Sequence, residues 1–555
     1  MKKSLSLLLC AVMLLSLLSG CGTESDEPYV PTGNALADEN APITEDPAGE
    51  AEQELTLVYY PGKTMHPLDC ADYTNRTILS LVYQSLFVVD DDYEVHPLLC
   101  KEYAVSDDMT TYTFFLHDNI RFSDGTPMTV KHVLASLGAA AESAVYGARF
   151  QHIYDWWEND DGSFSIYLGT PMENLPILLD FPILKTVPKS DDDEDNEDDE
   201  DEDEDATQPT TETQPEEDEG GLPVGSGPYF FDTTRAGLRL LKTVNWWCAD
   251  KVTPAVTASS VTLTEAGTPA QVRDAFEFGD VGLVCADPGS DTYADFRCDY
   301  ELWDIDSGIF LYIGFNLDEE FNSIFRDDDL RAAFTHAIDR ELLCRQYYRD
   351  YAAAASIPVS PHSPYYDETL AAQYAYDKDK FTQAVIKAGA QGEEISILVN
   401  PNDSLRMRVA EEIADMLEEC GLVVKLEEAV VNFEDNISYR STHLYLAQTK
   451  LSNNMDLSPF FYTYGTLSYG ALDNEGIYAF CKEALVNQGN YYNLHQQVME
   501  QGLICPVLFR SYAVYATRGL LTGLTPARDN VFYYDFGTDL GDIQIYLDEE
   551  PTEEE

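Results

Sequence analysis

The chain is 555 residues long, with 44% hydrophobic and 12% aromatic residues, which is enough apolar material for two or three packed domains. Its 100 aspartates and glutamates outnumber its 33 lysines and arginines, so the formal net charge is −67. This balance argues against a nucleic-acid partner, because no basic stripe is present to neutralise phosphates.

The amino terminus has the layout of a secretory signal. Lys2 and Lys3 precede an apolar run, Leu5–Leu18, that is shorter than the about 20 residues a membrane-spanning helix needs. The sequence Leu-Ser-Gly-Cys at 18–21 resembles a bacterial lipobox. The resemblance implies a signal peptide over 1–20, diacylglycerol on Cys21 and a chain held on the extracellular face of the cell membrane. The alternative is an ordinary secretory signal with a chance cysteine.

Three segments have compositions that predict no packed structure. Residues 21–53 are rich in Pro, Gly, Ala, Glu and Asp without periodicity, so we expect a flexible tether. Residues 190–221 are interpreted as a disordered acidic insertion, and residues 541–555 as an acidic tail. We expect the insertion to be a solvated surface loop; the alternative is weak calcium binding or steering of a cationic partner.

The eleven cysteines show no metal-binding spacing. Cys10 would leave with the signal peptide and Cys21 would carry lipid, and the other nine are scattered singly without a C-x-x-C pair. We interpret most of these nine as small buried apolar residues. Neither the cysteines nor the scattered histidines predict a metal site, and we expect no cofactor.

Apolar spacing predicts the elements of the first half of the chain. Alternation of apolar and polar residues predicts a strand over 54–59, and we also expect strands over 112–116, 163–168 and 238–244. Helical spacing predicts helices over 74–87, after Thr129 as the N-cap, and over 271–278.

Beyond about residue 308, predicted strands and helices alternate. We expect strands over 310–315, 395–399, 423–426 and 506–509, and helices over 329–347, 404–420 and 490–502. Such alternation implies a sheet covered by helices and therefore an α/β protein.

Four segments together resemble the family-5 extracellular solute-binding proteins, the peptide- and nickel-binding receptors of ABC importers. They are residues 97–129, Val224–Tyr229, Asp329–Arg340 and Ile504–Leu508, and they occur in the family order. Locally these motifs predict structure rather than ligand contacts. We expect a positive-φ turn at Gly125, close backbone approach at Gly225 and Gly227, and surface ion pairs at Arg331, Asp339 and Arg340.

The resemblance implies a two-lobed, periplasmic-binding-protein-like α/β fold of type II, with an extra N-terminal subdomain and mixed sheets with flanking helices. We expect the first lobe over 54–305, the second over 306–505 and a return to the first over 506–540. The crossovers are expected near 303–309 and 503–510. A solute, most simply a peptide, would be trapped between the lobes by hinge closure and delivered to the permease by a monomer.

Peptide-binding members commonly carry a Trp-x-Ala-Asp stretch whose aspartate pairs with the peptide ammonium. Here the tryptophan is absent, Asn453 stands near the expected position, and Asp456 is displaced by a few residues. Asp456 is therefore the candidate for the ammonium, and otherwise the ligand lacks a free amino terminus. The other candidate ligand contacts are aromatic: Tyr59, Tyr60, Trp246, Trp247, Tyr462 and Tyr464.

Other functions have less support from the residues. An enzyme is not indicated, because no Gly-x-Ser-x-Gly, His-Glu-x-x-His or phosphate-binding glycine loop occurs. Metal-chelate binding would need clustered histidines, and His66 and His336 are isolated in the sequence. The remaining alternative is a surface receptor, sensor or adhesion lipoprotein that uses the same scaffold without transport.

Overall fold

The computed structural model describes residues 55–186, 223–235, 237–293, 296–318, 320–321, 323–469, 472–521, 528, 534–535 and 545–547. The expected signal peptide with Cys21, the tether and the acidic insertion lie outside these residues, as does the tail except for 545–547. Below, the N-terminal region means residues 55–299 and the central region means residues 316–503.

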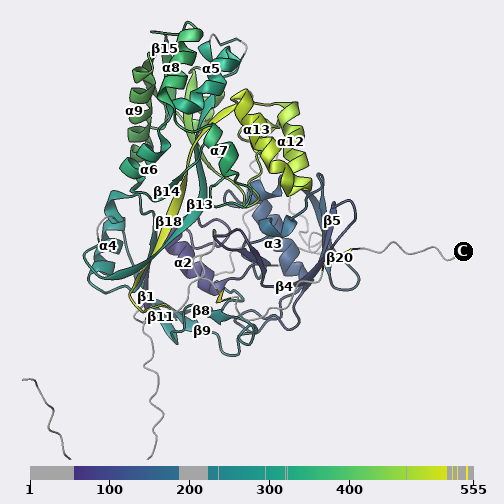
Figure 1. Ribbon diagram of the computed structural model, residues 1–555. Helices are drawn as coiled ribbons and strands as arrows, with labels where there is room; N and C mark the ends of the chain where they lie inside the picture. Colours follow the sequence, from purple (N-terminus) through teal and green to yellow (C-terminus); the bar gives the residue numbers. More distant parts are fainter. Residues whose placement is uncertain are drawn as a thin grey trace, which may run out of the picture. The chain divides into compact units, whose positions relative to one another are not determined.

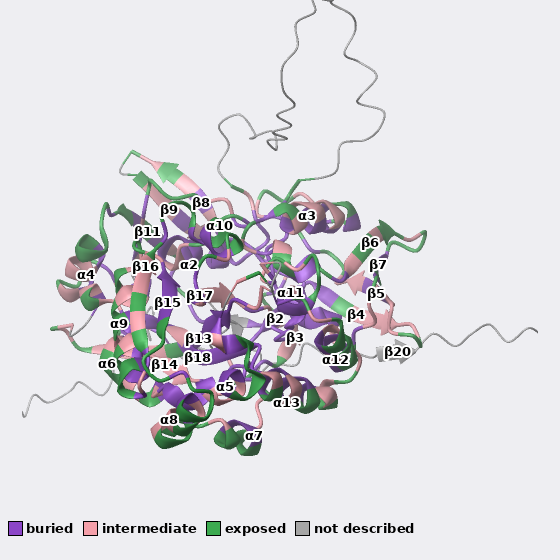
Figure 2. Ribbon diagram, turned by 90° about the horizontal axis from the view of Figure 1, so that it is seen from above, coloured by how far each residue is buried: buried purple, intermediate pink, exposed green. Residues whose placement is uncertain are grey.

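Two long antiparallel strands join the two regions. Strand β13 (Tyr300–Phe315) pairs with β18 (Ile504–Thr517) along its length, and the two run side by side through the structure (Figure 1). Side chains of β13 alternate between two hydrophobic cores. Phe310 and Tyr312 pack on one face of the sheet, and Leu311 and Ile313 pack on the other. Both strands are largely buried (Figure 2).

These strands lie within a seven-stranded sheet of the order β12-β18-β13-β17-β15-β16, with β14 also paired to β18. The other strands are β12 (Leu283–Ala286), β14 (Ala352–Ala354), β15 (Glu394–Val399), β16 (Val423–Glu428) and β17 (Leu444–Lys450). One face is covered by α5 (Asp328–Ala333), α6 (Arg340–Tyr348), α8 (Lys378–Lys387) and α9 (Ser404–Glu419). The other face packs against α7 (Glu368–Gln373), α10 (Phe433–Ser438), α11 (Ser458–Phe461), α12 (Glu475–Val486) and α13 (Tyr491–Gln501).

Two further sheets and two two-stranded pairs are built mainly from strands of the N-terminal region, with two short strands added from beyond residue 533. A four-stranded sheet has the order β1-β11-β9-β8, with β1 (Leu55–Tyr59), β8 (Tyr229–Thr234), β9 (Gly237–Lys242) and β11 (Ser260–Glu265). A five-stranded sheet has the order β20-β4-β5-β7-β6, with β4 (Cys100–Val105), β5 (Thr111–Leu116), β6 (Ile153–Glu158), β7 (Phe164–Leu168) and β20 (Ile545–Leu547). The pairs are β2 (Phe87–Val89) with β3 (Val95–Pro97), and β10 (Thr253–Pro254) with β19 (Tyr534–Asp535).

The helices of this region are α2 (Tyr73–Val82), α3 (Val130–Glu142) and α4 (Pro269–Glu277). Its main core includes Tyr512, Val514 and Ala516 from the far end of β18. Strand β18 therefore belongs to the cores of both regions.

The helix expected over 74–87 ends five residues earlier, at Val82, and Phe87 begins β2 instead. The glycine turn explains where the helix stops, since the Gly227 N–H donates to the Val82 carbonyl at 2.8 Å. A Cβ on Gly225 would lie 2.0 Å from that same carbonyl oxygen, so the close approach predicted for this glycine is confirmed. Tyr83 is then extended, and the chain leaves the helix.

The single helix expected over 329–347 is also wrong, because α5 and α6 are separated by a 3-10 turn over Phe334–Ala337 and an extended Ile338. Asp339 caps α6 by accepting from the Leu342 N–H. Arg340 is buried and donates to the carbonyls of Ala355 and Pro506 at 2.9 Å. The surface ion pair expected at Arg340 is therefore wrong: the charge is used to satisfy buried carbonyls.

Arg331 and Asp339 also depart from the expected surface pairs. Arg331 is buried and donates to the carbonyls of Phe325 and Gly502, although it also pairs with the exposed Asp328. Other local predictions are confirmed. Thr129 and His132 form a capping box on α3, Gly125 has φ +88°, and eight of the nine remaining cysteines are buried and all nine are free thiols.

Within the described ranges, no helix combines the length and apolar character that crossing a membrane requires.

Candidate functional site

The β13–β18 pair carries an irregularity at the point where the two regions meet. Asp306 pairs with Ser511 and Ile309 with Arg510, so Ser307 and Gly308 form a bulge. Gly308 has φ +70°, and its N–H donates to Asp306 Oδ1 at 2.8 Å. A bulge bends and twists the strand that carries it, so this is a position where the ladder can change direction.

Asp306 is buried at this bulge and is fully engaged by protein groups. It accepts from the Tyr93 hydroxyl at 2.7 Å and from the Ser360 hydroxyl. Burial alone would raise the pKa of Asp306, but the Arg528 cation and these donors hold the pKa below its ordinary value. The bulge is thus held by a charged carboxylate that contacts both regions.

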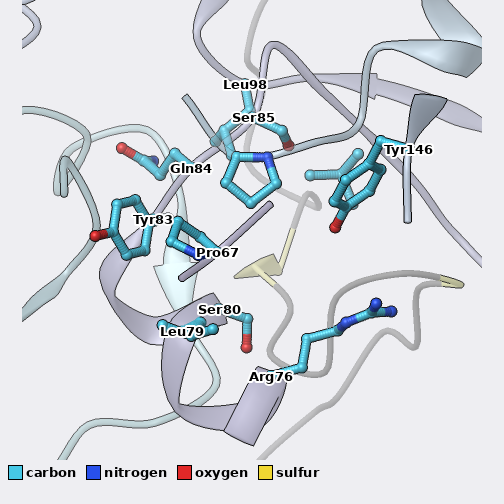
Figure 3. A pocket seen from close by; sticks show the side chains of 11 residues that line it. Pro67, Arg76, Leu79, Ser80, Tyr83, Gln84, Ser85, Leu98 and Tyr146 are labelled. Atoms are coloured by element: carbon cyan, nitrogen blue, oxygen red, sulfur yellow. The ribbon is translucent and has the colours of Figure 1, made fainter. Parts of the chain in front are cut away.

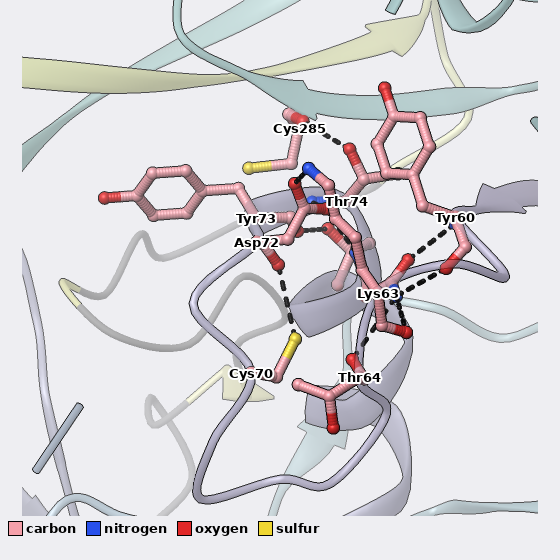
Figure 4. Close-up of polar contacts among 10 residues, drawn as sticks. Tyr60, Lys63, Thr64, Cys70, Asp72, Tyr73, Thr74 and Cys285 are labelled. Atoms are coloured by element: carbon pink, nitrogen blue, oxygen red, sulfur yellow. Dashed lines mark hydrogen bonds and ion pairs between the residues drawn. The ribbon is translucent and has the colours of Figure 1, made fainter. Parts of the chain in front are cut away.

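A pocket of about 440 Å³ lies beside the loop that leads into α2. Its lining residues are Lys63, Thr64, Asp69, Cys70, Ala71 and Asp72. Lys63 pairs with Asp72, and its ammonium lies 4.5 Å from the centre of the Tyr60 ring (Figure 4). The volume is in the range of small-molecule sites, and the lining offers both signs of charge beside an aromatic face.

The loop is fixed by short-range capping and by contacts to the long strands. Asp72 is the N-cap of α2 and accepts from the Thr74 N–H at 3.0 Å. The Thr74 hydroxyl donates to the Cys285 carbonyl of β12 at 3.4 Å (Figure 4), and the Tyr73 ring stacks on Tyr512 of β18 at 4.6 Å. The loop that lines the pocket therefore contacts strand β18 at Tyr512, one residue from Ser511, which pairs with Asp306 at the bulge.

A second cavity, of about 20 Å³, lies behind α2 and is lined by Arg76, Tyr83, Gln84 and Tyr146 among others (Figure 3). This is room for about one water molecule and not for a solute. The buried Gln84 Nε2 has no hydrogen-bond partner among the described residues, while Gln84 Oε1 accepts from Trp247 Nε1 at 2.8 Å. A single water there would satisfy the amide.

The aromatic candidates from the sequence lie in three different places. Tyr60 is buried beside Lys63 at the larger pocket, whereas the adjacent Tyr59 hydroxyl donates to Glu265 at 2.9 Å. Trp246 is buried and donates to the Ser226 carbonyl at 2.9 Å, and Trp247 contacts Gln84 at the small cavity. None of these four residues lines the larger pocket, although Tyr60 contacts its lining residue Lys63.

Tyr462 and Tyr464 form a surface cluster in the central region. Their rings lie 5.6 Å apart, and Tyr478 lies 5.0 Å from Tyr462. Tyr464 is 83% exposed and Tyr462 is 37% exposed. An exposed aromatic face of this kind is available to a partner or a ligand, but it is separate from the pocket at Lys63.

Asp456 is buried and bridges the two regions. Its Oδ2 lies 2.8 Å from His152 Nε2, and its Oδ1 accepts from the Ser458 N–H at 2.8 Å and the Ser458 hydroxyl at 2.6 Å. Burial alone would raise the pKa of Asp456, but His152 and the Ser458 donors hold it below its ordinary value. Both carboxylate oxygens therefore have protein partners.

Asn453 makes a similar contact three residues earlier. Its amide donates to Asp180 Oδ2 at 3.0 Å, and its carbonyl oxygen accepts from Arg528 at 3.1 Å. Asp180 in turn pairs with the buried Arg149. A chain of buried polar groups thus connects the N-terminal region, the central region and Arg528 near the carboxyl end.

Sequence reasoning found Asp456 but missed its partners. His152 and Asp180 lie 304 and 273 residues from Asp456 and Asn453, and no local pattern pairs them. The residues around Arg528 are likewise scattered along the chain. Only a prediction of long-range contacts could have joined these groups.

One group of three possible metal ligands occurs among the described residues, namely Asp90, Glu94 and His96. It belongs to the β2–β3 hairpin and not to either pocket.

Comparisons with solved structures define the class of fold. The substrate-binding protein CtaP of an ABC transporter from Listeria monocytogenes aligns with a TM-score of 0.65 at 19% identity, covering 84% of this chain and 94% of CtaP. The oligopeptide-binding protein AppA from Bacillus subtilis, solved with a nonapeptide, aligns with a TM-score of 0.58 at 18% identity, covering 86% of this chain and 97% of AppA. The fold is therefore the two-lobed α/β fold of periplasmic binding proteins, as the sequence predicts.

The family follows from the sequence itself. The model of the bacterial extracellular solute-binding proteins, family 5 (middle) matches residues 94–471, which is more than half of the chain. The chain belongs to this family, and it is a solute-binding protein rather than an enzyme. The glutathione-binding protein GsiB of Escherichia coli strain K12 is 23% identical over 370 residues, covering 65% of this chain. The match spans 66% of the length of GsiB, just under two thirds.

Proposed function

We propose that this protein is the membrane-anchored, extracellular substrate-binding protein of an ABC importer. It would capture a solute between its two lobes by hinge closure and pass it to the permease. The bulge at Ser307–Gly308 carries the proposal, because it places an irregularity in the strand pairing where the long strands pass from one region to the other. Closure would follow from a solute that contacts both lobes and so prefers the closed state.

The same proposal assigns the domain limits and the anchor. The first lobe comprises 54–305 with the return over 506–540, and the second comprises 306–505. The protein is a monomer held by lipid on Cys21. Replacing Cys21 with Ser is expected to release the chain from membranes into the medium, as measured by cell fractionation and intact mass. Retention of an unmodified chain on the membrane would contradict the anchor alone.

The solute is proposed to be a peptide that contacts the first lobe at the Lys63–Asp72 pocket. That pocket offers the Lys63 ammonium and the carboxylates of Asp69 and Asp72, which suit the two charged ends of a peptide. The relatives named above include a glutathione-binding protein and a structure with a bound nonapeptide, which supports this class of ligand.

Two measurements test the solute class. Mass spectrometry of natively purified protein would identify any retained small molecule, and calorimetry would screen dipeptides to octapeptides. Heat from peptides that is lost on replacing Lys63 with Met is the expected result. No heat from any peptide, together with a clear signal from another solute, would reject the peptide and leave the transport role open.

A further inference from the structure

The β2–β3 hairpin places three potential metal ligands on one face. Strand pairing joins Val88 to His96 and Val89 to Val95, and the Asp90 N–H donates to the Glu94 carbonyl at 3.1 Å. Because side chains alternate along a strand, Glu94 and His96 project from the same face, and Asp90 lies opposite Glu94 on that face. Glu94 is four positions after Asp90, and His96 is two positions after Glu94. Their side chains come together because β2 pairs with β3.

The donor atoms already lie close together. Asp90 Oδ2 is 2.7 Å from His96 Nε2, and one donor atom from each of the three residues lies within 4.8 Å of the others. Asp90 is buried, and its Oδ1 accepts from the Glu94 N–H at 2.8 Å, so this carboxylate has a fixed orientation. Glu94 is exposed and can turn toward the other two.

We propose that Asp90, Glu94 and His96 bind a divalent transition-metal ion of the zinc type, outside the solute site. One imidazole and two carboxylates are ligands that zinc accepts, with bonds of about 2.0–2.2 Å. Such bonds place neighbouring ligands roughly 3.3 Å apart, so the Asp90–His96 hydrogen bond would open by about half an ångström. Water would complete the coordination on the exposed side.

The charge around the hairpin tip favours a cation. Asp91 and Asp92 follow Asp90 directly, so three aspartates occupy consecutive positions after the end of β2. A divalent ion bound there would neutralise part of this negative charge.

The hairpin tip is also attached to the bulge between the long strands. The Tyr93 hydroxyl donates to Asp306, and the Arg528 guanidinium lies 4.3 Å from the centre of the Tyr93 ring. A metal ion that ties β2 to β3 would therefore hold a residue of the interlobe contact in place. Metal binding should accordingly raise the melting temperature of the whole chain and not only order the hairpin.

A simple ion pair is the alternative, and the chain contains a matched control for it. His66 Nδ1 lies 2.7 Å from Asp69 Oδ2, the same separation as in Asp90–His96, but no third ligand joins this pair in the described part of the chain. Replacing His66 with Gln therefore removes a histidine–aspartate pair without touching the proposed site.

Calorimetric titration of zinc into the metal-stripped full chain tests the proposal. We expect one event of highest affinity per chain in the wild type and in His66→Gln, weakened at least roughly tenfold in His96→Gln and in Glu94→Gln. Weak binding by the acidic segments is common to all variants and cancels in the comparison. Equal isotherms for the wild type and the His96→Gln variant would overturn the proposal.

Two further readouts guard against a folding artefact. Glu94 is exposed, so Glu94→Gln should fold normally, and circular dichroism would verify this for each variant. Nitrogen NMR of the histidine rings should show a zinc-dependent shift for His96 and none for His66. A shift at His66 instead, or a rise in melting temperature that persists in Glu94→Gln, would also contradict the site.

Discussion

The loop 453–458 and the loop 63–72 carry similar polar side chains in opposite environments. In the first, Asp456 is buried, and its carboxylate is paired with a histidine from the other region. In the second, Lys63 is half exposed and pairs with Asp72 at the edge of a pocket. The contrast teaches that ion pairs alone do not mark a binding site: the buried pair serves the contact between regions, while the exposed groups remain accessible to a solute.

The largest loss of stability should come from breaking the buried pair between Arg149 and Asp180, which Asn453 of loop 453–458 contacts. Replacing Arg149 with Met leaves the Asp180 carboxylate, which is 1% exposed, without its cation. We expect the free energy of unfolding to fall by about 3–5 kcal/mol, measured by urea denaturation. Adding Asp180→Asn to Arg149→Met should recover part of the loss; a single variant as stable as the wild type would contradict the burial argument.

The pH dependence of stability should reveal the cost of burying His495, whose ring nitrogens have no hydrogen-bond partner among the described residues. His495 of α13 is fully buried, its two ring nitrogens lack partners among the described residues, and burial lowers its pKa to about 3. A depressed pKa means that stability is complete above the unfolded value of about 6.5 and is lost as the pH falls toward 3. Between pH 7 and pH 4 we expect a loss of about 3 kcal/mol from this residue.

The measurement is unfolding at a series of pH values for the wild type and for His495→Phe. The variant should show a flatter profile below pH 6.5. Parallel profiles would show that His495 is not the group that titrates.

A smaller loss is expected from Asp456→Asn, because the amide keeps part of the Ser458 contacts. We expect about 1.5–3 kcal/mol at pH 7. The lowered pKa of Asp456 means that its contribution is present above about pH 4 and is lost below that value, so the variant should differ least from the wild type in acid. If peptide affinity is unchanged in Asp456→Asn, Asp456 is no longer a candidate for the peptide ammonium.

The smallest effect on stability is expected from Lys63→Met at the pocket. An exposed pair contributes between about 0 and 1 kcal/mol, so unfolding should change little while solute affinity falls. Lys387→Met is the matched control, since Lys387 pairs with Asp329 on the surface far from either loop in sequence. A stability loss at Lys63 as large as that at Arg149 would remove the distinction between the two loops.

Local patterns predicted those parts of the fold whose causes are local. The helix cap at Thr129 and the strand at 310–315 depend on neighbours in the sequence, and both were expected from it. The break between α5 and α6 was missed, because it follows from Arg340 reaching the carbonyls of Ala355 and Pro506 on distant segments. A surface helix and a kinked, buried one have the same apolar spacing.

The residues of the candidate site were harder to predict from the sequence than the fold. Tyr60 was named from its residue type, and the structure places it against Lys63 rather than in the pocket lining, whereas Lys63 and Asp72 were not singled out. Asp456 was chosen by resemblance, and the buried His152 beside it could not be foreseen from a separation of 304 residues. Residue type suggests chemistry, whereas tertiary contacts decide which groups are already used.

Strand β18 has a consequence for how the chain assembles. Its first half completes the cores of the central region, and Tyr512, Val514 and Ala516 complete the core of the N-terminal region. The core of the N-terminal region, which is made first, is therefore complete only when residues 512–516 of β18 have been added. A fragment that stops before residue 504 would leave apolar surface open in both lobes, so each lobe depends on the same late-made segment for its stability.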